Sequence, residues 1–544
     1  MNILAVIPAR GGSKGIPRKN MRLMNGRPLI EYAISNALSS RLVTDVAVSS
    51  DSPEILAFAS RFEGAEALDR DSGLAADAVT LDPVVYDATV RMEQLRATTY
   101  DAVVTLQPTS PLLTVATLDA ALEEFASGKT DSLISVVNDP HLSWRESEDG
   151  SIAPAYEKRL NRQQLPPEYR ETGAFLVARR QCVTPESRLG AAIGVFEVPA
   201  HEALDIDTTE DWIVSEAMLG RKRIAFRVDG YPELGMGHVF RCLTLAYDLV
   251  GHNVVFVCNA AHREGIDKLR ASNFEVVEIE DDRTFFDWLS TAQVDIVVND
   301  ILDTAADYIL AIHPHVKRIV SFEDLGQGAR LANAVVNAIY EGASSLSNAY
   351  TGASYVCLRD EFFTVLPKAF SPAVERVLVM FGGTDPSDLS SRLYAFAQSY
   401  RENGGIATFD FVLGPGYQGA SVVDDPEKGI SVFQDVARVS DHMARADLAF
   451  CSQGRTTFEL AAMGVPSIVL AQNEREQLHT FAQMENGFVN LGLGSAVSDD
   501  DIAKTFEWLV GAHSVRREMR NRMLANDLRS GIKRVRRIIL GEAL

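Results

Sequence analysis

Residues 3–20 read Ile3-Leu4-Ala5-Val6-Ile7-Pro8-Ala9-Arg10-Gly11-Gly12-Ser13-Lys14-Gly15-Ile16-Pro17-Arg18-Lys19-Asn20. The first five residues are apolar and predict a buried strand. The glycines that follow let the backbone approach a ligand closely, and free N–H groups together with cationic side chains bind phosphate oxygens. The stretch therefore predicts a polyphosphate-binding loop at the end of a strand, although a solvated basic turn has the same residue types. The Walker pattern G-x-x-x-x-G-K-[ST] is absent.

The residues around this loop predict an α/β fold. From residue 1 to about 137, short strand-like runs alternate with helical patterns, which is typical of a mostly parallel sheet covered by helices. Apolar residues recur at helical spacing over 30–42. Strands are predicted at 46–48, 102–106, 133–137, 174–177 and 193–198. The polar, proline-containing stretch 139–169 predicts a long excursion, and such excursions are often functional.

A second α/β series begins after Gly220-Arg221-Lys222-Arg223, where a helix that starts at Thr208 is predicted to end. The series opens with a strand at 224–228, pauses near 368–372 and restarts at Arg376. We therefore predict a first domain at 1–221 and a second domain at 222–544. The second domain is expected to have two lobes, at about 222–370 and 371–544, that face a cleft. The last 30 residues predict amphipathic helices.

Composition limits the partners. The chain has 544 residues and a net charge of −22, which disfavours nucleic acid as a partner. Its five cysteines are odd in number and scattered, which argues against a disulfide framework and a zinc site. No charged leader precedes an apolar run, and no apolar stretch reaches 18 residues. We therefore expect a cytoplasmic protein that neither enters nor crosses a membrane.

Four ordered segments carry a specific resemblance. The loop at 8–20 resembles the signature of the CMP-sialic acid synthetases and related nonulosonate cytidylyltransferases. The segments Gln107-Pro108-Thr109-Ser110-Pro111-Leu112, Arg162-Gln163-Gln164-Leu165-Pro166 and Asp205-Ile206-Asp207-Thr208 are similar to three further family motifs. The resemblance spans residues 3–219. It implies a Rossmann-like nucleotidyltransferase fold and transfer of CMP from CTP to a nonulosonic acid, with release of diphosphate.

The same resemblance implies the site residues of the first domain. Lys19 would be the main phosphate contact and, with Asp207, a catalytic residue. The residues implied for CTP are Arg10, Gly12, Ser13, Lys14, Lys19, Asn20 and Arg70. Those implied for the sugar are Gln107, Arg162, Gln163 and Thr172.

Asp205 and Asp207 are the candidate metal ligands. Residues two apart in an extended segment point the same way, so both carboxylates can reach a hard cation such as Mg²⁺. A D-x-D before a helix also occurs as plain capping, and Thr208 with Asp211 forms a capping-box pattern. The resemblance favours magnesium, which would bridge the CTP phosphates and help deprotonate the sugar hydroxyl.

One segment departs from the family pattern. Many sialic acid enzymes have N-G-A-[IF]-Y, whereas this chain has Thr172-Gly173-Ala174-Phe175-Leu176. The change removes an amide and a phenol hydroxyl from the expected sugar pocket. We therefore expect a nonulosonate other than common sialic acid, such as a legionaminic or pseudaminic type.

His238 is the candidate catalytic residue of the second domain. It follows Gly235-Met236-Gly237 at a strand-to-helix turn, where an imidazole can serve as a general base or be purely structural. The segments 229–242, 381–385 and 452–460 resemble the UDP-sugar hydrolases of pseudaminic acid synthesis and, through them, the glycosyltransferases of the GT-B fold. The resemblance covers about residues 223–540.

This second resemblance implies that His238 activates water against an anomeric carbon. It implies UDP-sugar contacts at Gly237, Gly382, Gly383, Glu459, Asn473, Glu474 and Gln477. Glu459 would bind the uridine ribose. The alternative interpretation is that Glu459 is an ordinary solvated residue on a helix. Two other functions stay open for this domain, namely a glycosyltransferase and a non-catalytic nucleotide-sugar scaffold.

Together the two domains predict two steps of one pathway. The second would remove UDP from a diacetamido sugar, and the first would attach CMP to the extended product. The step between them predicts association with a nonulosonate synthase that uses phosphoenolpyruvate. We also expect a homo-oligomer.

Overall fold

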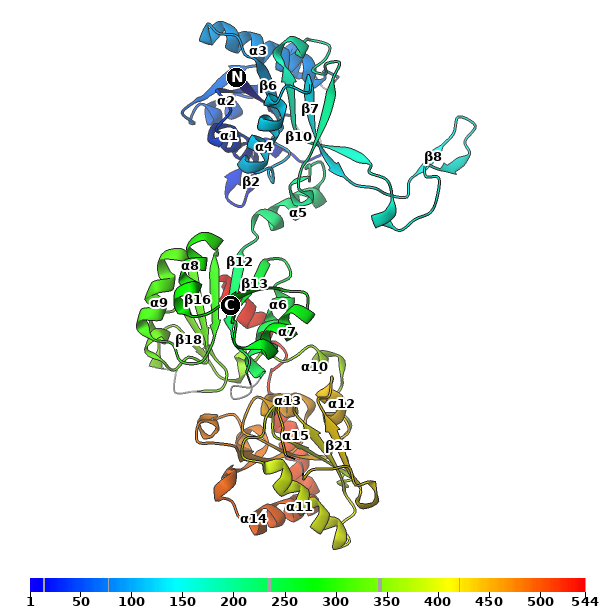
Figure 1. The fold of residues 1–544 in the computed structure, drawn as a ribbon, viewed down its shortest axis with the longest axis vertical. Coiled ribbons are helices and arrows are strands. Elements are labelled where there is room, and N and C mark those ends of the chain that lie inside the picture. The colour runs from blue at the N-terminus through cyan, green and yellow to red at the C-terminus, as the bar shows by residue number, and fades with distance from the viewer. Residues whose placement is uncertain (13–14, 77, 232–235, 341–344, 420, 544) are drawn as a thin grey trace. The chain divides into compact units, whose positions relative to one another are not determined.

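The computed structural model describes residues 1–12, 15–76, 78–231, 236–340, 345–419 and 421–543 (Figure 1). Contacts between Cα atoms divide the chain into two units, Met1–Arg221 and Lys222–Leu544. Each unit has its own α/β architecture, so the predicted α/β class is confirmed. No helix among these residues is both long and apolar enough to span a membrane. All five cysteines are free.

A seven-stranded sheet of order β11-β7-β10-β6-β1-β4-β5 forms the centre of unit 1. Neighbouring strands run parallel except at β10, which is antiparallel to both β6 and β7. The predicted mostly parallel sheet is therefore confirmed. The strands are β1 (Ile3–Pro8), β4 (Asp45–Ser50), β5 (Ala65–Asp69), β6 (Ala102–Leu106), β7 (Ser132–Asn138), β10 (Tyr169–Arg179) and β11 (Ile193–Glu197).

Alternation along β1 explains how helices cover both faces of this sheet. Ile3, Ala5 and Ile7 pack in one cluster with the apolar sides of α1 and α4, whereas Leu4 and Val6 pack in another with α3. Successive strand side chains point to opposite faces, so an uninterrupted apolar strand needs cover on both. The helices are α1 (Leu29–Ser39), α2 (Pro53–Ala59), α3 (Leu81–Arg96), α4 (Val115–Ala126) and α5 (Thr209–Leu219).

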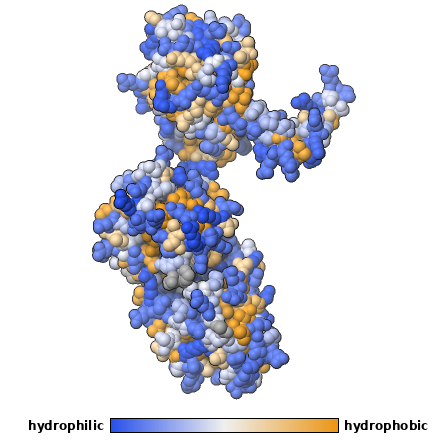
Figure 2. All heavy atoms as spheres, in the orientation of Figure 1, coloured by the Kyte–Doolittle hydropathy of each residue, from blue (hydrophilic) through white to orange (hydrophobic). Residues whose placement is uncertain are grey.

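The expected excursion projects from the sheet of unit 1 as an arm between β7 and β10 (Figures 1 and 2). It contains a short antiparallel hairpin of β8 (Trp144–Glu146) and β9 (Ile152–Pro154). Figure 2 shows it as mainly hydrophilic with a few hydrophobic residues. A second small hairpin, β2 (Leu23–Met24) with β3 (Arg27–Pro28), follows the loop that the sequence predicts to bind polyphosphate.

Unit 2 contains two fully parallel sheets. The first has the order β14-β13-β12-β15-β16-β17-β18 and the second β21-β20-β19-β22-β23-β24. The first comprises β12 (Arg223–Val228), β13 (Asn253–Asn259), β14 (Glu275–Ile279), β15 (Ile296–Asp300), β16 (Arg318–Phe322), β17 (Ala334–Asn337) and β18 (Ala349–Thr351). The second comprises β19 (Arg376–Met380), β20 (Thr408–Leu413), β21 (Ile430–Gln434), β22 (Leu448–Cys451), β23 (Ser467–Ala471) and β24 (Phe488–Leu493).

Helices cover both sheets of unit 2. In the first lobe α8 and α9 lie on one face and α6 and α7 on the other (Figure 1). This lobe contains α6 (Gly237–Asp248), α7 (Arg263–Ala271), α8 (Asp282–Ala292) and α9 (Ala306–Ile312), and the short α10 (Glu361–Thr364) follows. The second lobe contains α11 (Leu389–Glu402), α12 (Val439–Met443), α13 (Thr456–Met463), α14 (Asp499–Gly511) and α15 (His513–Ala525).

The last helix, α16 (Gly531–Leu540), returns to the first lobe. Its Val535 and Ile539 are fully buried in the same cluster as β12 and α6, and Lys222 Nζ donates to the carbonyl oxygen of Leu540 at 2.7 Å. The predicted lobes, about 222–370 and 371–544, therefore differ from the structure at α16, which belongs to the second range in sequence but packs in the first lobe. Two parallel-sheet lobes around one cavity are the predicted GT-B type of architecture, which is confirmed.

Candidate active sites

A small apolar cluster positions the loop after β1. Ile16 is buried together with Met24, Leu29, Tyr32, Ile206 and Trp212. The cluster brings the loop against the segment that precedes α5, although the two are far apart in sequence. A Cβ on Gly15 would lie 2.6 Å from the carbonyl oxygen of Asp207, so only glycine allows this approach.

Lys19 lies where the two segments meet. Its Nζ donates to the carbonyl oxygen of Ile206 at 2.6 Å and lies 3.8 Å from Asp207 Oδ1. The Lys19 side chain is 15% exposed, whereas that of Asp207 is 78% exposed. The ammonium group is thus fixed by the backbone, while the Asp207 carboxylate is free to meet a ligand in solvent.

A cavity of about 430 Å³ lies beside this junction. Seven of the residues that the sequence suggested for CTP, sugar or metal line it: Arg10, Lys19, Asn20, Arg70, Gln107, Asp205 and Asp207. Asn20 is buried, and its Nδ2 donates to the carbonyl oxygen of Arg10 at 3.0 Å. Gly12 is exposed and does not belong to the lining, while Ser13 and Lys14 lie outside the described residues.

Arg70 forms the buried, cationic part of this wall. Its guanidinium donates to Ser49 Oγ at 3.1 Å and to the Ser49 carbonyl oxygen at 2.6 Å. Burial lowers the pKa of Arg70, and the nearby Arg10 acts in the same direction. Two guanidinium groups close together in a cavity favour an anionic ligand.

Asp205 has the properties of a metal ligand. Its Oδ1 is buried without a hydrogen-bond partner among the residues described. Burial raises the pKa of Asp205, and the neighbouring Asp207 contributes to the rise. A buried carboxylate oxygen without a partner carries a desolvation cost that a divalent cation would offset. The residues present therefore fit a magnesium ion held by Asp205 and Asp207.

Thr172 does not line the cavity as expected. It is buried, and its hydroxyl lies 2.9 Å from Ser135 Oγ inside the sheet. Leu176 also packs inside, against the cluster under α3. The irregular register between β10 and β7 turns Gly173 instead toward the cavity wall, where a Cβ would lie 2.9 Å from Asp205 Oδ2.

The arm carries the two other predicted sugar ligands. Arg162 and Gln163 are exposed in a 3₁₀ turn, and Arg162 Nη2 donates to Asp139 Oδ1 at 2.8 Å. Neither residue lines the cavity of unit 1 in this structure.

A second cavity, of about 460 Å³, lies between the two lobes of unit 2. The predicted residues that line it are Gly237, His238, Gly382, Gly383, Glu459 and Asn473. Glu474 and Gln477 are not in its lining. Glu476 lines the cavity, and burial raises its pKa.

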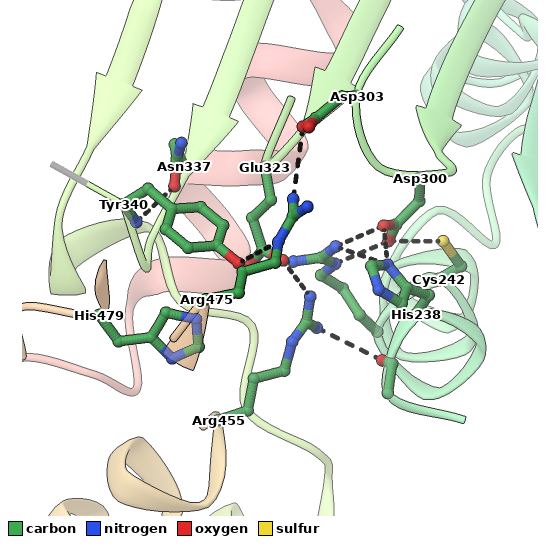
Figure 3. Close-up of polar contacts among 12 residues, drawn as sticks. His238, Cys242, Asp300, Asp303, Glu323, Asn337, Tyr340, Arg455, Arg475 and His479 are labelled. Atoms are coloured by element: carbon green, nitrogen blue, oxygen red, sulfur yellow. Dashed lines mark hydrogen bonds and ion pairs between the residues drawn. The ribbon is translucent and has the colours of Figure 1, made fainter. Parts of the chain in front are cut away.

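A network of buried charges surrounds His238 at the carboxyl edge of the first sheet (Figure 3). His238 Nδ1 lies 2.5 Å from Asp300 Oδ1, and Arg241 Nε donates to Asp300 Oδ2 at 2.7 Å. Arg241 also pairs with Glu323. Arg455, from the second lobe, pairs with Glu323 at 2.7 Å and donates to the Gly237 carbonyl oxygen at 3.3 Å.

The two carboxylates of this network are ionised. Burial opposes ionisation, but Arg241 and His238 outweigh it and lower the pKa of Asp300. Burial likewise opposes the ionisation of Glu323, whereas Arg241 and Arg455 lower its pKa to about 2. Asp300, Arg241 and Glu323 are not among the residues predicted from the sequence. Asp300 ends β15 and Glu323 follows β16, and an acidic residue directly after such an apolar run was the available signal.

Glu459 is not a solvated helix residue. Its side chain is 15% exposed on the first turn of α13, and Arg359 Nη2 pairs with its Oε1 at 2.9 Å. Burial raises the pKa of Glu459, and Arg359 opposes the rise. Arg475 makes a further link between the lobes, since its Nε donates to the Tyr340 hydroxyl at 3.1 Å (Figure 3).

Known proteins are similar to the first part of the chain. The family model described as Cytidylyltransferase matches residues 4–185. The pseudaminic acid cytidylyltransferase of Campylobacter jejuni subsp. jejuni serotype O:2 is 33% identical over 217 residues, 39% of this chain and 93% of its own length. The CMP-N,N'-diacetyllegionaminic acid synthase of Legionella pneumophila is 32% identical over 226 residues, 40% of this chain and 97% of its own.

Two further matches extend the comparison. The protein MJ1062 of Methanocaldococcus jannaschii is 28% identical over 279 residues, which is 47% of this chain and only 57% of that protein. Among solved structures, MurG of Acinetobacter baumannii has a TM-score of 0.45 and 15% sequence identity, covering 59% of this chain and 99% of MurG.

Unit 1 thus has the fold of a nucleotidyltransferase, and cationic and acidic side chains line one cavity beside its open α/β sheet. The chain belongs to the cytidylyltransferase family.

Proposed function

We propose that unit 1 transfers CMP from CTP to a nonulosonic acid in a magnesium-dependent reaction. The observation that carries the proposal is the cavity that Arg10, Lys19 and Arg70 line together with Asp205 and Asp207. Nucleotidyl transfer depends on neutralising phosphate charge and holding the nucleophile in line. Cations for the phosphates and carboxylates for a metal are the groups that this chemistry requires.

Each residue of the site has a defined task in this proposal. Lys19, held by the Ile206 carbonyl oxygen, presents its charge to the phosphates, and Arg10 and Arg70 neutralise the departing diphosphate. Gln107 orients the sugar. Asp205 and Asp207 would hold Mg²⁺, which when bound supplies positive charge to the phosphates and acidifies the sugar hydroxyl.

The sugar that fits the proposal is a legionaminic or pseudaminic type of acid. Support comes from the two relatives, whose names specify these acids and whose identities, 33% and 32%, do not favour one over the other. Thr172 and Leu176 no longer support the choice, because both side chains are turned away from the cavity.

The test is the purified chain with CTP and a panel of nonulosonic acids, with product masses measured. Diphosphate release should require both the acid and Mg²⁺. Asp207→Asn should lower kcat by about 10²-fold or more through the lost metal charge. Glu210→Gln is the matched control, since Glu210 is exposed on the first turn of α5. An unaffected rate in Asp207→Asn would contradict the metal assignment.

We infer that unit 2 hydrolyses a UDP-diacetamido-trideoxyhexose upstream in the same pathway. Support comes from the cavity between the lobes. His238, Gly382, Gly383 and Glu459 all line it. An imidazole in the wall of a cavity can deprotonate a water molecule that attacks an anomeric carbon.

A glycosyltransferase is the second candidate, because the same two-lobed architecture serves both reactions. Release of free monosaccharide without an acceptor would support hydrolysis, whereas turnover only with an added acceptor would support transfer. The His238→Gln variant tests the non-catalytic scaffold. If this variant loses activity but still binds UDP-sugar, unit 2 is not a scaffold alone.

We propose two kinds of partner. A nonulosonate synthase would catalyse the reaction between the steps proposed for unit 2 and unit 1. Self-association is supported by exposed apolar side chains on the arm of unit 1, where Trp144 is 56% and Ile152 62% exposed. The oligomeric state in solution, with and without Trp144→Ser, tests that proposal.

A further inference from the structure

We propose that Asp300 is a positioning residue for unit 2: it fixes His238 as the tautomer protonated on Nδ1 and so presents Nε2 to the cavity as the basic atom. The inference rests on the proposed role of His238 as the base of unit 2. It assigns a function to a carboxylate that is too deeply buried to contact a substrate.

The geometry carries the first step. His238 belongs to the first turn of α6, and its Nδ1 lies 2.5 Å from Oδ1 of Asp300, the last residue of β15. Asp300 is fully buried, with 0% of its surface exposed, so its carboxylate cannot meet a substrate. His238 lines the cavity. Of the two ring nitrogens, Nδ1 is therefore committed to the interior of the lobe and Nε2 remains for the cavity.

The charge of Asp300 determines where the shared proton lies. Arg241 donates to both oxygens of Asp300 and keeps the carboxylate ionised. An ionised carboxylate only accepts hydrogen bonds, and an unprotonated nitrogen would repel it at this distance. Arg241 Nη2 also lies 3.3 Å from Nδ1, but the carboxylate oxygen is closer, at 2.5 Å, so the proton is on Nδ1 and the lone pair is on Nε2.

The surrounding groups make this arrangement stable. The charged groups around the His238–Asp300 dyad are Arg241, Glu323 and Arg455, and Cys242 Sγ lies 3.3 Å from Asp300 Oδ2. When Nε2 accepts a proton, the adjacent Asp300 stabilises the positive ring, as expected of a carboxylate behind a general base.

Asp300→Asn preserves the size of the side chain and reverses its hydrogen bonding. The amide can donate to Nδ1, which would favour the opposite tautomer, with Nε2 protonated. We expect kcat of the unit 2 reaction to fall by about 10²- to 10⁴-fold, the range for a lost tautomer-fixing carboxylate, with KM changed less than about threefold. The acidic limb of the pH profile of the residual activity should move to lower pH.

Asp295→Asn is the matched control. Asp295 precedes the same strand at its opposite end, is partly buried and pairs with Lys317 at 2.8 Å. It should retain wild-type kcat and pH profile. A loss of kcat in Asp300→Asn with an unmoved pH profile, or an equal loss in Asp295→Asn, would show a merely structural role and overturn the proposal.

Proton NMR of the wild-type full chain tests the dyad without any turnover. The short Nδ1–H···Oδ1 bond should give a far-downfield proton resonance that disappears in His238→Gln and in Asp300→Asn and persists in Asp295→Asn. A wild-type spectrum without that resonance would overturn the proposal. If the resonance is present but no UDP-sugar is turned over, the dyad stands and the proposed function of unit 2 fails.

Discussion

At the scale of single residues, Lys19 is the side chain of unit 1 whose loss should reduce the rate of CMP transfer most specifically. Lys19→Met should lower kcat/KM for CMP transfer by about 10²- to 10³-fold, the range for removing one preorganised charge-stabilising donor. The backbone contact at Ile206 holds the ammonium in the cavity, so the loss is specific to this position. Steady-state kinetics with varied CTP would measure it.

Arg18→Met is the control for that loss. Arg18 is the immediate neighbour in the same basic loop, but its side chain is 71% exposed and pairs with Glu54. Near wild-type kinetics are expected for this variant. If Arg18→Met and Lys19→Met lose activity equally, the loop contributes only general positive charge.

Asp205 couples stability to pH. Because burial raises its pKa in the folded state, the ionised carboxylate costs stability above that raised pKa, and the cost disappears below the ordinary value of an aspartate. Asp205→Asn should therefore raise the Tm of unit 1 near pH 7 in metal-free buffer and leave it unchanged near pH 3. Calorimetry at both pH values measures this. Added Mg²⁺ should stabilise only the wild type, and equal stabilisation of both proteins would exclude Asp205 as a ligand.

Several residues that line the cavity of unit 1 could be predicted from the sequence, but the directions in which their side chains point could not. Arg10, Lys19, Asn20, Arg70 and Gln107 share one cavity as the motif resemblance implied. Thr172 was misplaced because the register between β10 and β7 shifts beside it, and a shift of one residue reverses which face a side chain takes. Asp300 was missed because a single aspartate at a strand end carries no motif.

At the scale of elements, the cap of α5 also holds the backbone of Asp207, one of the two proposed metal ligands. The predicted capping box is present: Thr208 accepts from the Asp211 amide, and Asp211 accepts in turn from the Asp207 and Thr208 amides. Thr208→Ala should destabilise unit 1 by about 1 kcal/mol. Because Asp207 is held by the same cap, this variant should also need more Mg²⁺ for half-maximal CMP transfer.

Ser498→Ala separates the effect of capping on stability from its effect on the Mg²⁺ requirement. Ser498 caps α14 in unit 2 in the same way, accepting from the Asp501 amide. A similar loss of stability is expected with no change in the Mg²⁺ requirement. A raised requirement in both variants would mean that capping affects metal binding only through general stability.

Most elements were predictable because their apolar pattern is local. The strand predicted at 102–106 is β6 with the same bounds, and the helix predicted at 30–42 is α1, which ends earlier, at Ser39. The antiparallel direction of β10 was not predictable, because a largely buried strand reads as one apolar run whether its neighbours are parallel or antiparallel. The return of α16 to the first lobe was missed for a similar reason: an amphipathic pattern shows that one face is buried but not against what.

At the scale of the whole molecule, the described buried clusters separate at the boundary between the units. The clusters of unit 1 contain residues only up to Leu219, and those of unit 2 begin at Ile224. Val535→Asp places a charge in the core that α16 completes and should destabilise unit 2 by about 3 kcal/mol or more. The chain should then show two separate calorimetric transitions, with UDP-sugar turnover lost and CMP transfer retained.

Lys533→Asp tests whether that effect comes from the core. Lys533 is exposed on the same helix, so the substitution makes a larger change in charge without entering the buried cluster. Both activities should persist in it, because a surface substitution usually changes stability by less than about 0.5 kcal/mol. If Val535→Asp abolished CMP transfer together with UDP-sugar turnover, unit 1 would depend on the folding of unit 2, and the fusion would be a single cooperative enzyme rather than two enzymes on one chain.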